Sequence, residues 1–275
     1  MNKAQPTPYP DVNAILQELL VSVQAILGAH FIGMYLDGSL TGSDFDQDSD
    51  IDFVVVSDED ISSELFVGLQ TMHDRLGTLD SPWAIQLEGS YLSQQALRRY
   101  DPTHALHPNI ERGPGERLKM ADHGDAWLVH LAILRERGIT LVGPAPQTLI
   151  EPVSPQDLRR AMLGVVHGWA ANLLANPSEI GSRGYQSYVV LAQCRILYTL
   201  DSGTVASKRV AARWAQASLD GRWAPLIERA WEGRHHPDMP PAPEDLNETL
   251  QFIRYTMVRS QQDERAMDEA GRPHP

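Results

Sequence analysis

The stretch of sequence that decides the fold is Asp50-Ile51-Asp52-Phe53-Val54-Val55-Val56, which follows Gly38-Ser39 after a ten-residue polar loop. Its run of β-branched and apolar residues is typical of a central strand. Side chains at positions i and i+2 of a strand point to the same face, so Asp50 and Asp52 place two carboxylates side by side. The sequence therefore predicts an acidic pair at the start of a buried strand.

This acidic pair predicts a magnesium site that also binds phosphate. Two adjacent carboxylates repel each other, and a hard divalent cation between them offsets that cost. Mg²⁺ typically takes one or two carboxylates and completes its octahedron with phosphate oxygens and water. Gly38 would let a phosphate approach the backbone closely, and Ser39 would supply a hydroxyl and an N–H to phosphate oxygens. The weaker interpretation is that these residues merely form a turn and a strand edge.

A third carboxylate lies on another predicted strand. Residues 83–92 alternate polar and apolar side chains, which places Glu88 on one face together with Gln86 and Ser90. Taken alone, Glu88 would be interpreted as a surface residue of a half-exposed strand. Its convergence with two other carboxylates beside a Gly-Ser turn favours a functional site instead.

Outside this motif, the first half of the chain alternates predicted helices and strands. Apolar residues at three-and-four spacing indicate amphipathic helices, whereas short β-branched or alternating runs indicate strands. Residues 98–115 contain several Pro, Gly and His residues without a sustained period, so we expect an irregular excursion there. The predicted elements are helices over residues 11–29, 61–76 and 125–137, strands over 31–36, 51–56 and 83–92, and a short extended piece over 139–144.

The second half of the chain shows only helical patterns. Ser154 followed by Pro155 places a cap residue before a proline at the first helical position. The predicted helices cover residues 154–173, 185–200, 207–218, 223–232 and 243–260. We therefore expect an α+β protein, with a mixed sheet and flanking helices over residues 1–146, an all-α helical bundle over 147–262 and a flexible tail over 263–275.

The charge of the chain is concentrated near its amino terminus. With 23 basic and 36 acidic residues the net charge is −13, which argues against a nucleic-acid partner, because such affinity is built mainly from Lys and Arg on phosphates. Between Lys3 and Arg75 the sequence has thirteen acidic residues and neither Lys nor Arg. Such local charge usually forms a solvated surface. Here Asp50 and Asp52 would bind metal, other acidic residues would solvate the surface, and the remaining excess would attract a cationic small molecule.

Cysteine usage and hydropathy indicate a cytoplasmic protein. The single cysteine, Cys194, cannot form an internal disulfide, and its apolar neighbours favour a packed side chain over a nucleophile. Residues 1–10 lack the charged and apolar segments of a secretory signal, and no apolar run approaches the ~20 residues of a membrane span. We expect a cytoplasmic monomer that binds neither membranes nor nucleic acids.

The same residues carry a resemblance to a known family. The run from Gly38-Ser39 to residues 50–56 resembles the motif of the DNA polymerase β-like nucleotidyltransferase superfamily. Within it, residues 30–260 resemble the streptomycin/spectinomycin adenylyltransferases, the aminoglycoside (3'')(9) nucleotidyltransferases, which have a helical carboxy-terminal domain. The resemblance implies that residues 1–146 form a polymerase β-like nucleotidyltransferase domain. Further matching stretches are residues 87–91, 131–134, 141–145, 195–198 and 207–212.

In the first half of the chain, the resemblance implies a role for each motif residue. Asp50 and Asp52 would hold two Mg²⁺ ions and take part in catalysis, and Glu88 would be the catalytic base. Ser39, with Ser49 close by, would contact the triphosphate of ATP, the co-substrate. The expected partners are therefore ATP, Mg²⁺ and a cationic small-molecule acceptor.

In the helical half, the resemblance implies further contacts to the nucleotide. Arg195 and Lys208 would bind the nucleotide phosphates, so that the site would lie between the domains, and Trp231 would lie near the nucleotide. The residues alone leave alternatives open. Arg195 has apolar neighbours and could equally be an arginine at the edge of the core. Lys208 lies in the first turn of a predicted helix, where the dipole disfavours a cation unless an anion is nearby.

One departure from the family concerns the acceptor. In streptomycin-modifying members, a tryptophan and an acidic residue that contact the antibiotic precede the helix that carries Arg195. The aligned stretch here, Gly181-Ser182-Arg183-Gly184-Tyr185-Gln186, contains neither residue type. We therefore favour spectinomycin over streptomycin, and leave another aminocyclitol or an unrelated hydroxyl-bearing acceptor open.

The expected reaction is Mg-dependent transfer of AMP from ATP to a hydroxyl of an aminoglycoside or aminocyclitol antibiotic, with release of pyrophosphate. One alternative keeps the nucleotidyltransferase chemistry but makes the acceptor a protein or another small-molecule hydroxyl. The other is a nucleotide-binding module without turnover, which the presence of Asp50, Asp52 and Glu88 disfavours.

Overall fold

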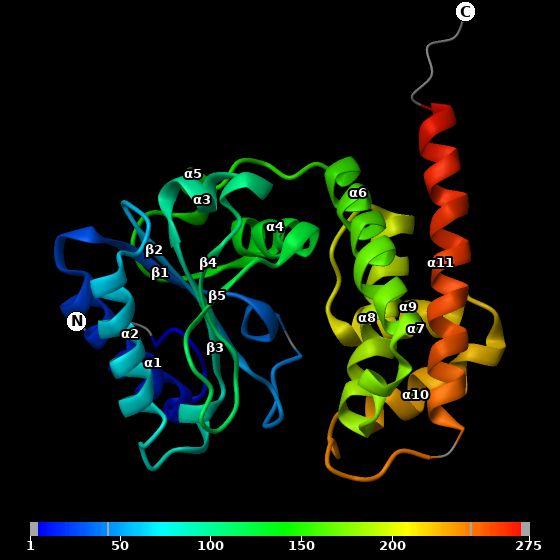
Figure 1. The fold of residues 1–275 in the computed structure, drawn as a ribbon, viewed down its shortest axis with the longest axis horizontal. Coiled ribbons are helices and arrows are strands. Elements are labelled where there is room, and N and C mark those ends of the chain that lie inside the picture. The colour runs from blue at the N-terminus through cyan, green and yellow to red at the C-terminus, as the bar shows by residue number, and fades with distance from the viewer. Residues whose placement is uncertain (1–4, 43, 243, 271–275) are drawn as a thin grey trace, which may run out of the picture. The chain divides into compact units, whose positions relative to one another are not determined.

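Two compact units make up the chain. The computed structural model describes residues 5–42, 44–242 and 244–270, and separates a unit that ends at Pro152 from one that begins at Val153 (Figure 1). The first unit is a mixed sheet with flanking helices and the second is helical, so the expected α+β class is confirmed. The boundary that we predicted after residue 146 lies a few residues before the observed one, which follows Pro152. Helix α5 (Pro146–Leu149) packs on elements of the first unit and belongs to it.

The first unit is built on a six-stranded sheet with the strand order β5-β4-β3-β2-β1-β6. Strands β2 and β3 run parallel, and the other neighbouring strands run antiparallel. A parallel pair needs a crossover connection, which here contains helix α2 (Ser63–Leu76). The strands are β1 Phe31–Leu36, β2 Ile51–Ser57, β3 Leu87–Ser93, β4 His107–Ile110, β5 Lys119–Ala121 and β6 Ile139–Val142.

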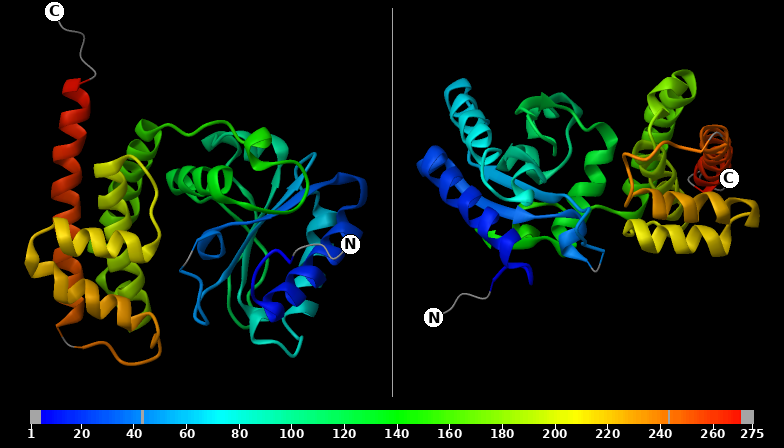
Figure 2. Two further views of the ribbon diagram at one scale, coloured as in Figure 1. Left: turned by 180° about the vertical axis from the view of Figure 1, so that it is seen from behind. Right: turned by 90° about the horizontal axis from the view of Figure 1, so that it is seen from below.

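One face of this sheet is apolar and packs against α1 (Pro10–Leu27) and α2 (Figure 2, right). Phe53 of β2 and Tyr91 of β3 point into this core and are fully buried. Because strand side chains alternate between faces, Asp52 and Glu88 point away from the core, to the opposite face. The alternation that places Phe53 and Tyr91 in the core therefore places the carboxylates of Asp52 and Glu88 on the other face of the sheet.

The opposite face of the sheet is polar near Asp52 and Glu88 and apolar further along, where Val54, Val56 and Leu92 are buried. Helix α4 (Trp127–Arg137) partly covers this face. The ring of Trp127 lies 5.0 Å from the ring of His107 in β4, measured between centroids. His130 of α4 contacts Asp37 at the end of β1. Helix α4 thus reaches across the sheet from β4 to β1.

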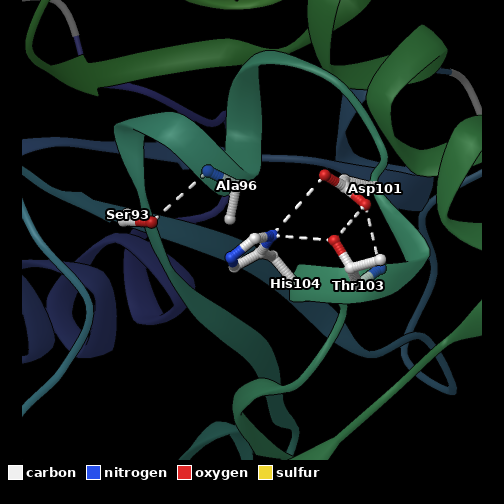
Figure 3. A network of polar contacts seen from close by, with 5 residues as sticks. All are labelled: Ser93, Ala96, Asp101, Thr103 and His104. Atoms are coloured by element: carbon white, nitrogen blue, oxygen red, sulfur yellow. Dashed lines mark hydrogen bonds and ion pairs between the residues drawn. The ribbon is translucent and has the colours of Figure 1, made fainter.

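The segment over residues 98–115, which we expected to be irregular, contains strand β4. The expectation was wrong because the alternating residues of β4 are polar: His107 and Asn109 are buried and share the polar face. Asp101 holds the turn before β4, since its carboxylate accepts hydrogen bonds from the backbone N–H and hydroxyl of Thr103, at 2.9 and 2.7 Å (Figure 3). Helix α3 (Gln94–Arg98), which was also not predicted, precedes this turn.

Strand β3 begins at Leu87, later than the predicted start at residue 83. Residues Pro82–Ile85 form a 3-10 turn instead. Ser81 caps this turn, because its hydroxyl accepts a hydrogen bond from the N–H of Trp83 at 3.3 Å, and Pro82 suits the first position of a helical turn. The local cap chemistry overrides the alternating pattern of the side chains.

The second unit is a helical bundle around α8 (Arg183–Ser202). Helices α6, α9, α10 and α11 all pack on α8, and Cys194 in its centre is fully buried. Burial raises the pKa of the Cys194 thiol, in agreement with the packed side chain that the sequence predicts. The other helices are α6 Pro155–Val165, α7 Ala171–Ala175, α9 Lys208–Ser218, α10 Ala224–Gly233 and α11 Asp245–Ala270, with a π-helical segment Val166–Ala170 between α6 and α7.

The last helix is longer than predicted. We expected the helix to end near residue 260 and a tail from residue 263, but α11 continues to Ala270. Ser260 is fully buried, and the carboxylate of Glu264 lies 3.8 Å from Nε2 of His167. Residues 271–275 lie outside the described part of the chain.

The stretch Pro10–His30, which includes α1, is long and apolar enough to cross a membrane by length and composition, with a mean hydropathy of 1.5. The expectation that no apolar run approaches this length was therefore wrong. Val12, Leu16, Leu19 and Val23 are nevertheless buried in the core of the first unit. The apolar character of α1 is explained by its packing under the sheet.

His73 makes the stability of this core depend on pH. Its Nε2 lies 2.7 Å from the hydroxyl of Tyr91, and burial lowers the pKa of His73 from 6.5 to about 4. The unfolded chain therefore binds more protons than the folded chain between these values, so stability is lost as the pH falls. Between about pH 7 and about pH 5, His73 should lower the free energy of unfolding by about 2 kcal/mol.

Urea unfolding at both pH values tests this expectation. His73→Gln should lose less stability on acidification than the wild type, whereas His236→Gln, at an exposed position, should behave as the wild type does. Equal losses for wild type and His73→Gln would contradict the assignment.

Candidate active site

Gly38 determines how closely the backbone can approach the carboxylate of Asp52. One further backbone hydrogen bond joins the residue after β1 to β2. The N–H of Asp37 donates to the carbonyl of Asp52 at 3.0 Å. Gly38 follows with a φ of +60°, and a Cβ built there would overlap the Oδ2 atom of Asp52. Only glycine fits this position, for both conformational and steric reasons.

A row of carboxylates crosses the polar face of the sheet. The register of the parallel pair sets Asp52 directly beside Glu88, and the bond from Asp37 to Asp52 places Asp37 on the other side. Gly89 pairs with Ile110 in the antiparallel ladder of β3 and β4, so Glu111 lies beside Glu88 on the side away from Asp52. Asp50 lies two residues before Asp52 and on the same face. The predicted convergence of Asp50, Asp52 and Glu88 agrees with this geometry.

Cationic side chains border this carboxylate row. Lys119 Nζ lies 2.8 Å from a carboxylate oxygen of Glu111. Arg112 Nη1 lies 3.8 Å from Asp50 Oδ2 and donates to the carbonyl of Asp48 at 3.1 Å. These partners compensate the outer carboxylates, and Asp52 and Glu88 lie in the centre of the row.

The surroundings of Glu88 favour its protonated form relative to an exposed glutamate. Burial raises the pKa of Glu88 most, and the negative charge of Asp50 raises it further, while Arg112 and His130 oppose this shift. A carboxylate with a raised pKa accepts a proton more readily near neutral pH. The half-buried Glu88 is thus suited to take a proton from a nearby hydroxyl.

The two predicted serines lie on either side of the loop between β1 and β2. Ser39 is in the 3-10 turn Gly38–Thr41, and its buried Oγ has no hydrogen-bond partner within the described residues. Ser49 is buried, and its hydroxyl exchanges hydrogen bonds with Asp46, at 3.0 Å to Oδ1 and from the backbone N–H. Ser39 therefore has a hydroxyl to offer a ligand, whereas Ser49 holds the turn that precedes Asp50.

Asp37 and His130 also belong to this site, and the sequence reading missed both. Asp37 is 3% exposed, its Oδ1 has no partner within the described residues, and its Oδ2 lies 3.3 Å from Nδ1 of His130. His130 stacks on Trp127 with centroids 5.3 Å apart. The position of Asp37 next to the Gly-Ser turn is a signal that could have identified it, but His130 lies on a helix far away in sequence.

The donor set of the site fits magnesium. Across the described ranges, no three His, Cys, Asp or Glu side chains lie close enough to form a complete metal site from protein groups alone. Mg²⁺ needs only one or two carboxylates when phosphate and water supply its other ligands. Asp50 and Asp52 are the residues that could hold it, next to the unpartnered hydroxyl of Ser39.

The predicted residues of the helical half gather at the start of α9. The Nε of Arg195 donates to the carbonyl of Ala206 at 3.2 Å, directly before the cap residue Ser207 and before Lys208, the first residue of α9. The first turn of α9 has no acidic side chain. Arg209 of the same turn lies over the ring of Trp231, with its Cζ 4.5 Å from the ring centroid. Arg195 and, through Arg209, the ring of Trp231 thus both have contacts at the start of α9, where Lys208 lies.

Comparisons with known proteins agree with both halves of this description. Residues 148–259 match the family model described as aminoglycoside adenylyltransferase, C-terminal domain. The chain is 26% identical to a spectinomycin 9-adenylyltransferase of Staphylococcus aureus over 229 residues, which cover 80% of this chain and 84% of that protein. It is also 26% identical to an aminoglycoside (3'')(9) adenylyltransferase of Escherichia coli over 265 residues, which cover 89% of this chain and 94% of that protein.

A solved structure shares the fold. The crystal structure of spectinomycin adenyltransferase AAD(9) from Enterococcus faecialis, with ATP and spectinomycin, superimposes with a TM-score of 0.68 at 17% identity. The match covers 90% of this chain and 98% of that chain. The arrangement of a mixed sheet followed by a helical bundle is therefore common to both proteins.

Substitution of Gly38 should disturb the acidic pair. Gly38→Ala forces a side chain into the carboxylate of Asp52 and a residue with a Cβ into positive φ, which together should weaken Mn²⁺ binding about tenfold or more. Mn²⁺ titration followed by electron paramagnetic resonance measures this. Gly42→Ala is the matched control, because the nearest atom to its Cβ would be 3.9 Å away. Equal affinities for Gly38→Ala and Gly42→Ala would show that Asp52 does not bind the metal.

Proposed function

We propose that this chain, which belongs to the family of the aminoglycoside and spectinomycin adenylyltransferases, transfers AMP from ATP to a hydroxyl group of an aminoglycoside or aminocyclitol antibiotic. The observation that carries the proposal is the carboxylate row, in which Asp52 lies beside Glu88 next to a Gly-Ser turn. A metal-binding carboxylate, a proton acceptor and a phosphate-binding turn are the groups that this reaction requires.

In the proposed reaction, the acceptor oxygen forms a bond to the α-phosphorus of ATP and the bond to the bridging oxygen of the β-phosphate breaks. Pyrophosphate leaves with that oxygen, and the proton of the acceptor hydroxyl passes to Glu88. Asp50 and Asp52 hold Mg²⁺, and the hydroxyl of Ser39 donates to a phosphate oxygen. When bound, Mg²⁺ neutralises charge on the phosphoryl oxygens and lowers the pKa of a coordinated hydroxyl.

The helical unit contributes binding of the nucleotide. Arg195 and Lys208 carry fixed positive charge at the start of α9, where the helix dipole adds to their attraction for phosphate. We infer that both side chains bind the triphosphate. Ser49 serves the same ligand indirectly, because its bonds to Asp46 support the loop before the acidic pair.

For the acceptor, we favour spectinomycin over streptomycin. Residues 181–186 contain neither the tryptophan nor the acidic residue that streptomycin-modifying family members have before this helix. Arg183 begins helix α8 in this stretch, and its positive charge disfavours a strongly cationic acceptor group. The acidic surface of the first unit still attracts a moderately cationic aminocyclitol. We further propose a cytoplasmic monomer that acts without nucleic acid or membrane partners.

A panel of aminoglycosides and aminocyclitols with MgATP tests the proposed activity. Mass spectrometry should show a gain of one adenylyl group on spectinomycin and no product with streptomycin. Absence of product with every acceptor would favour a protein or another small-molecule hydroxyl as acceptor. ATP binding without pyrophosphate release under any of these conditions would favour a non-catalytic nucleotide-binding module.

Glu88→Gln tests the proton acceptor. It should lower turnover by about 10²- to 10⁴-fold, the usual contribution of a general base, because the amide of glutamine does not accept the proton. ATP affinity, measured by calorimetry, should stay unchanged. Glu64→Gln, at an exposed position in the first turn of α2, is the matched control and should retain full turnover. Near-wild-type turnover of Glu88→Gln would contradict its role as base.

A further inference from the structure

A buried aspartate and an exposed histidine form a pair beside the carboxylate row. Nδ1 of His130 lies 3.3 Å from Oδ2 of Asp37. The side chain of Asp37 is 4% exposed, and that of His130 is 48% exposed. An ionised carboxylate only accepts hydrogen bonds, so Nδ1 carries the ring proton and donates it. The lone pair of the neutral ring is then on Nε2, which has no hydrogen-bond partner within the described residues.

A second contact fixes the plane of this histidine ring. His130 stacks on the indole of Trp127, with centroids 5.3 Å apart and planes 22° apart. Trp127 is buried and is itself held on the sheet by the ring of His107. With a carboxylate at Nδ1 and an indole against its face, the imidazole has lost most of its freedom before a ligand arrives. A hydrogen bond to Nε2 therefore costs little ordering entropy.

The pair lies close to Glu88. Burial raises the pKa of Glu88 most, and the charge of His130 opposes this shift, so the imidazole is within electrostatic reach of that carboxylate. Helix α4, which carries His130, also packs on the turn Gly38–Thr41. A ligand that brings a hydroxyl to Glu88 therefore comes near the exposed side of His130.

The charge of Asp37 determines which ligand groups the pair favours. Within the described residues, Asp37 forms no ion pair with Lys or Arg, and its Oδ1 has no hydrogen-bond partner. Its negative charge behind the imidazole repels a phosphate and attracts a cation. The pair thus combines a free hydrogen-bond acceptor with negative charge, which suits a protonated amine.

We propose that Nε2 of His130 accepts a hydrogen bond from a protonated amino group of the acceptor, and that Asp37 is the positioning residue that fixes the ring. The inference rests on the proposed function, because that function brings a hydroxyl of the acceptor to Glu88. A hydrogen bond from an ionised donor is about twice as strong as one between neutral groups. The pair therefore selects acceptors that carry an amine near the reacting hydroxyl, as aminocyclitols do.

Calorimetric titration of the full chain with spectinomycin, in the presence of Mg²⁺ and α,β-methylene-ATP, measures acceptor binding without turnover. His130→Phe keeps a ring against Trp127 but removes the nitrogen, and should weaken spectinomycin binding about tenfold. His130→Gln returns an acceptor oxygen and should restore part of this loss. Affinity for the ATP analogue should stay unchanged in both variants, because the contact is made to the acceptor.

His130→Lys identifies the group that His130 binds. Lysine only donates hydrogen bonds, so it cannot replace Nε2 toward an ammonium group, but it can bind a hydroxyl or a phosphate. We expect His130→Lys to bind spectinomycin no better than His130→Phe does. Spectinomycin affinity restored by His130→Lys would assign the contact to a hydroxyl and would contradict the amine. Tighter binding of the ATP analogue by His130→Lys would place His130 at the phosphates instead.

Asp37→Asn tests the positioning residue. An amide can donate to Nδ1 or accept from it, so the variant no longer fixes the ring proton and also removes the charge behind the ring. Spectinomycin binding should weaken about threefold to tenfold, and should weaken less in the His130→Phe background, because Asp37 acts through the imidazole. An equal loss in both backgrounds would contradict this role. A loss of Mn²⁺ affinity of about tenfold would make Asp37 a metal ligand and would also contradict it.

The chain offers a matched control pair outside the carboxylate row. Nδ1 of His30 lies 2.9 Å from Oδ1 of Asp58, which follows the end of β2, and both side chains are exposed. His30→Gln and Asp58→Asn remove the same groups and should leave all affinities unchanged. Circular dichroism verifies that each variant is folded, and His130→Gln and His130→Lys decide if His130→Phe is not.

Two further results would overturn the inference. One is spectinomycin binding by His130→Phe that equals binding by His30→Gln. The other is a His130→Phe variant that loses affinity for the ATP analogue but not for spectinomycin. The binding measurements are independent of turnover, so a wild-type chain that binds spectinomycin but adenylylates no acceptor would contradict only the proposed function. A wild-type chain that binds no aminocyclitol of the panel would contradict both.

Discussion

The contact between the Gly38 backbone and the carboxylate of Asp52 is the constraint on which the acidic site depends. It requires a residue without a side chain at a positive φ, directly after the last residue that pairs β1 with β2. Because Asp52 is held from one side by this turn and from the other by the register with Glu88, its carboxylate has little freedom to move away from its neighbours. The repulsion within the row is therefore built into the fold, and the Mg²⁺ that we propose would relieve it.

The two units carry side chains of opposite charge at the places described above. The first unit presents carboxylates, which bind phosphate only through a metal, and the second presents guanidinium and ammonium groups, which bind phosphate directly. The net charge of −13, as a single sum over the chain, does not show this difference between the two units.

Much of the first unit could be predicted from sequence, because its core strands alternate or are continuously apolar. Phe31–Leu36 appears as predicted, and Asp52 lies beside Glu88 on the face opposite the core, as expected. Strand β4 escaped prediction because its buried residues His107 and Asn109 are polar, so hydropathy carries no signal there. Asp37 and His130 were missed for a related reason. Their contact joins the end of β1 to α4, which is far away in sequence, so no local sequence pattern indicates it. The contact of Arg209 with Trp231 likewise depends on how α9 and α10 pack.

The parallel pairing of β2 with β3 also has a consequence for the order of folding. Asp52 and Glu88 meet only after the chain has passed through α2 and returned, whereas β1 and β2 are close in sequence and can pair early. Contacts between residues far apart in sequence form only after the entropic cost of closing the intervening loop has been met. The β2–β3 ladder is therefore expected to form late. An early intermediate would then hold the Gly-Ser turn and Asp52 without Glu88. If Glu88 is the proton acceptor and Asp50 and Asp52 bind metal, as we propose, a partly folded chain could bind metal before it could transfer a nucleotide.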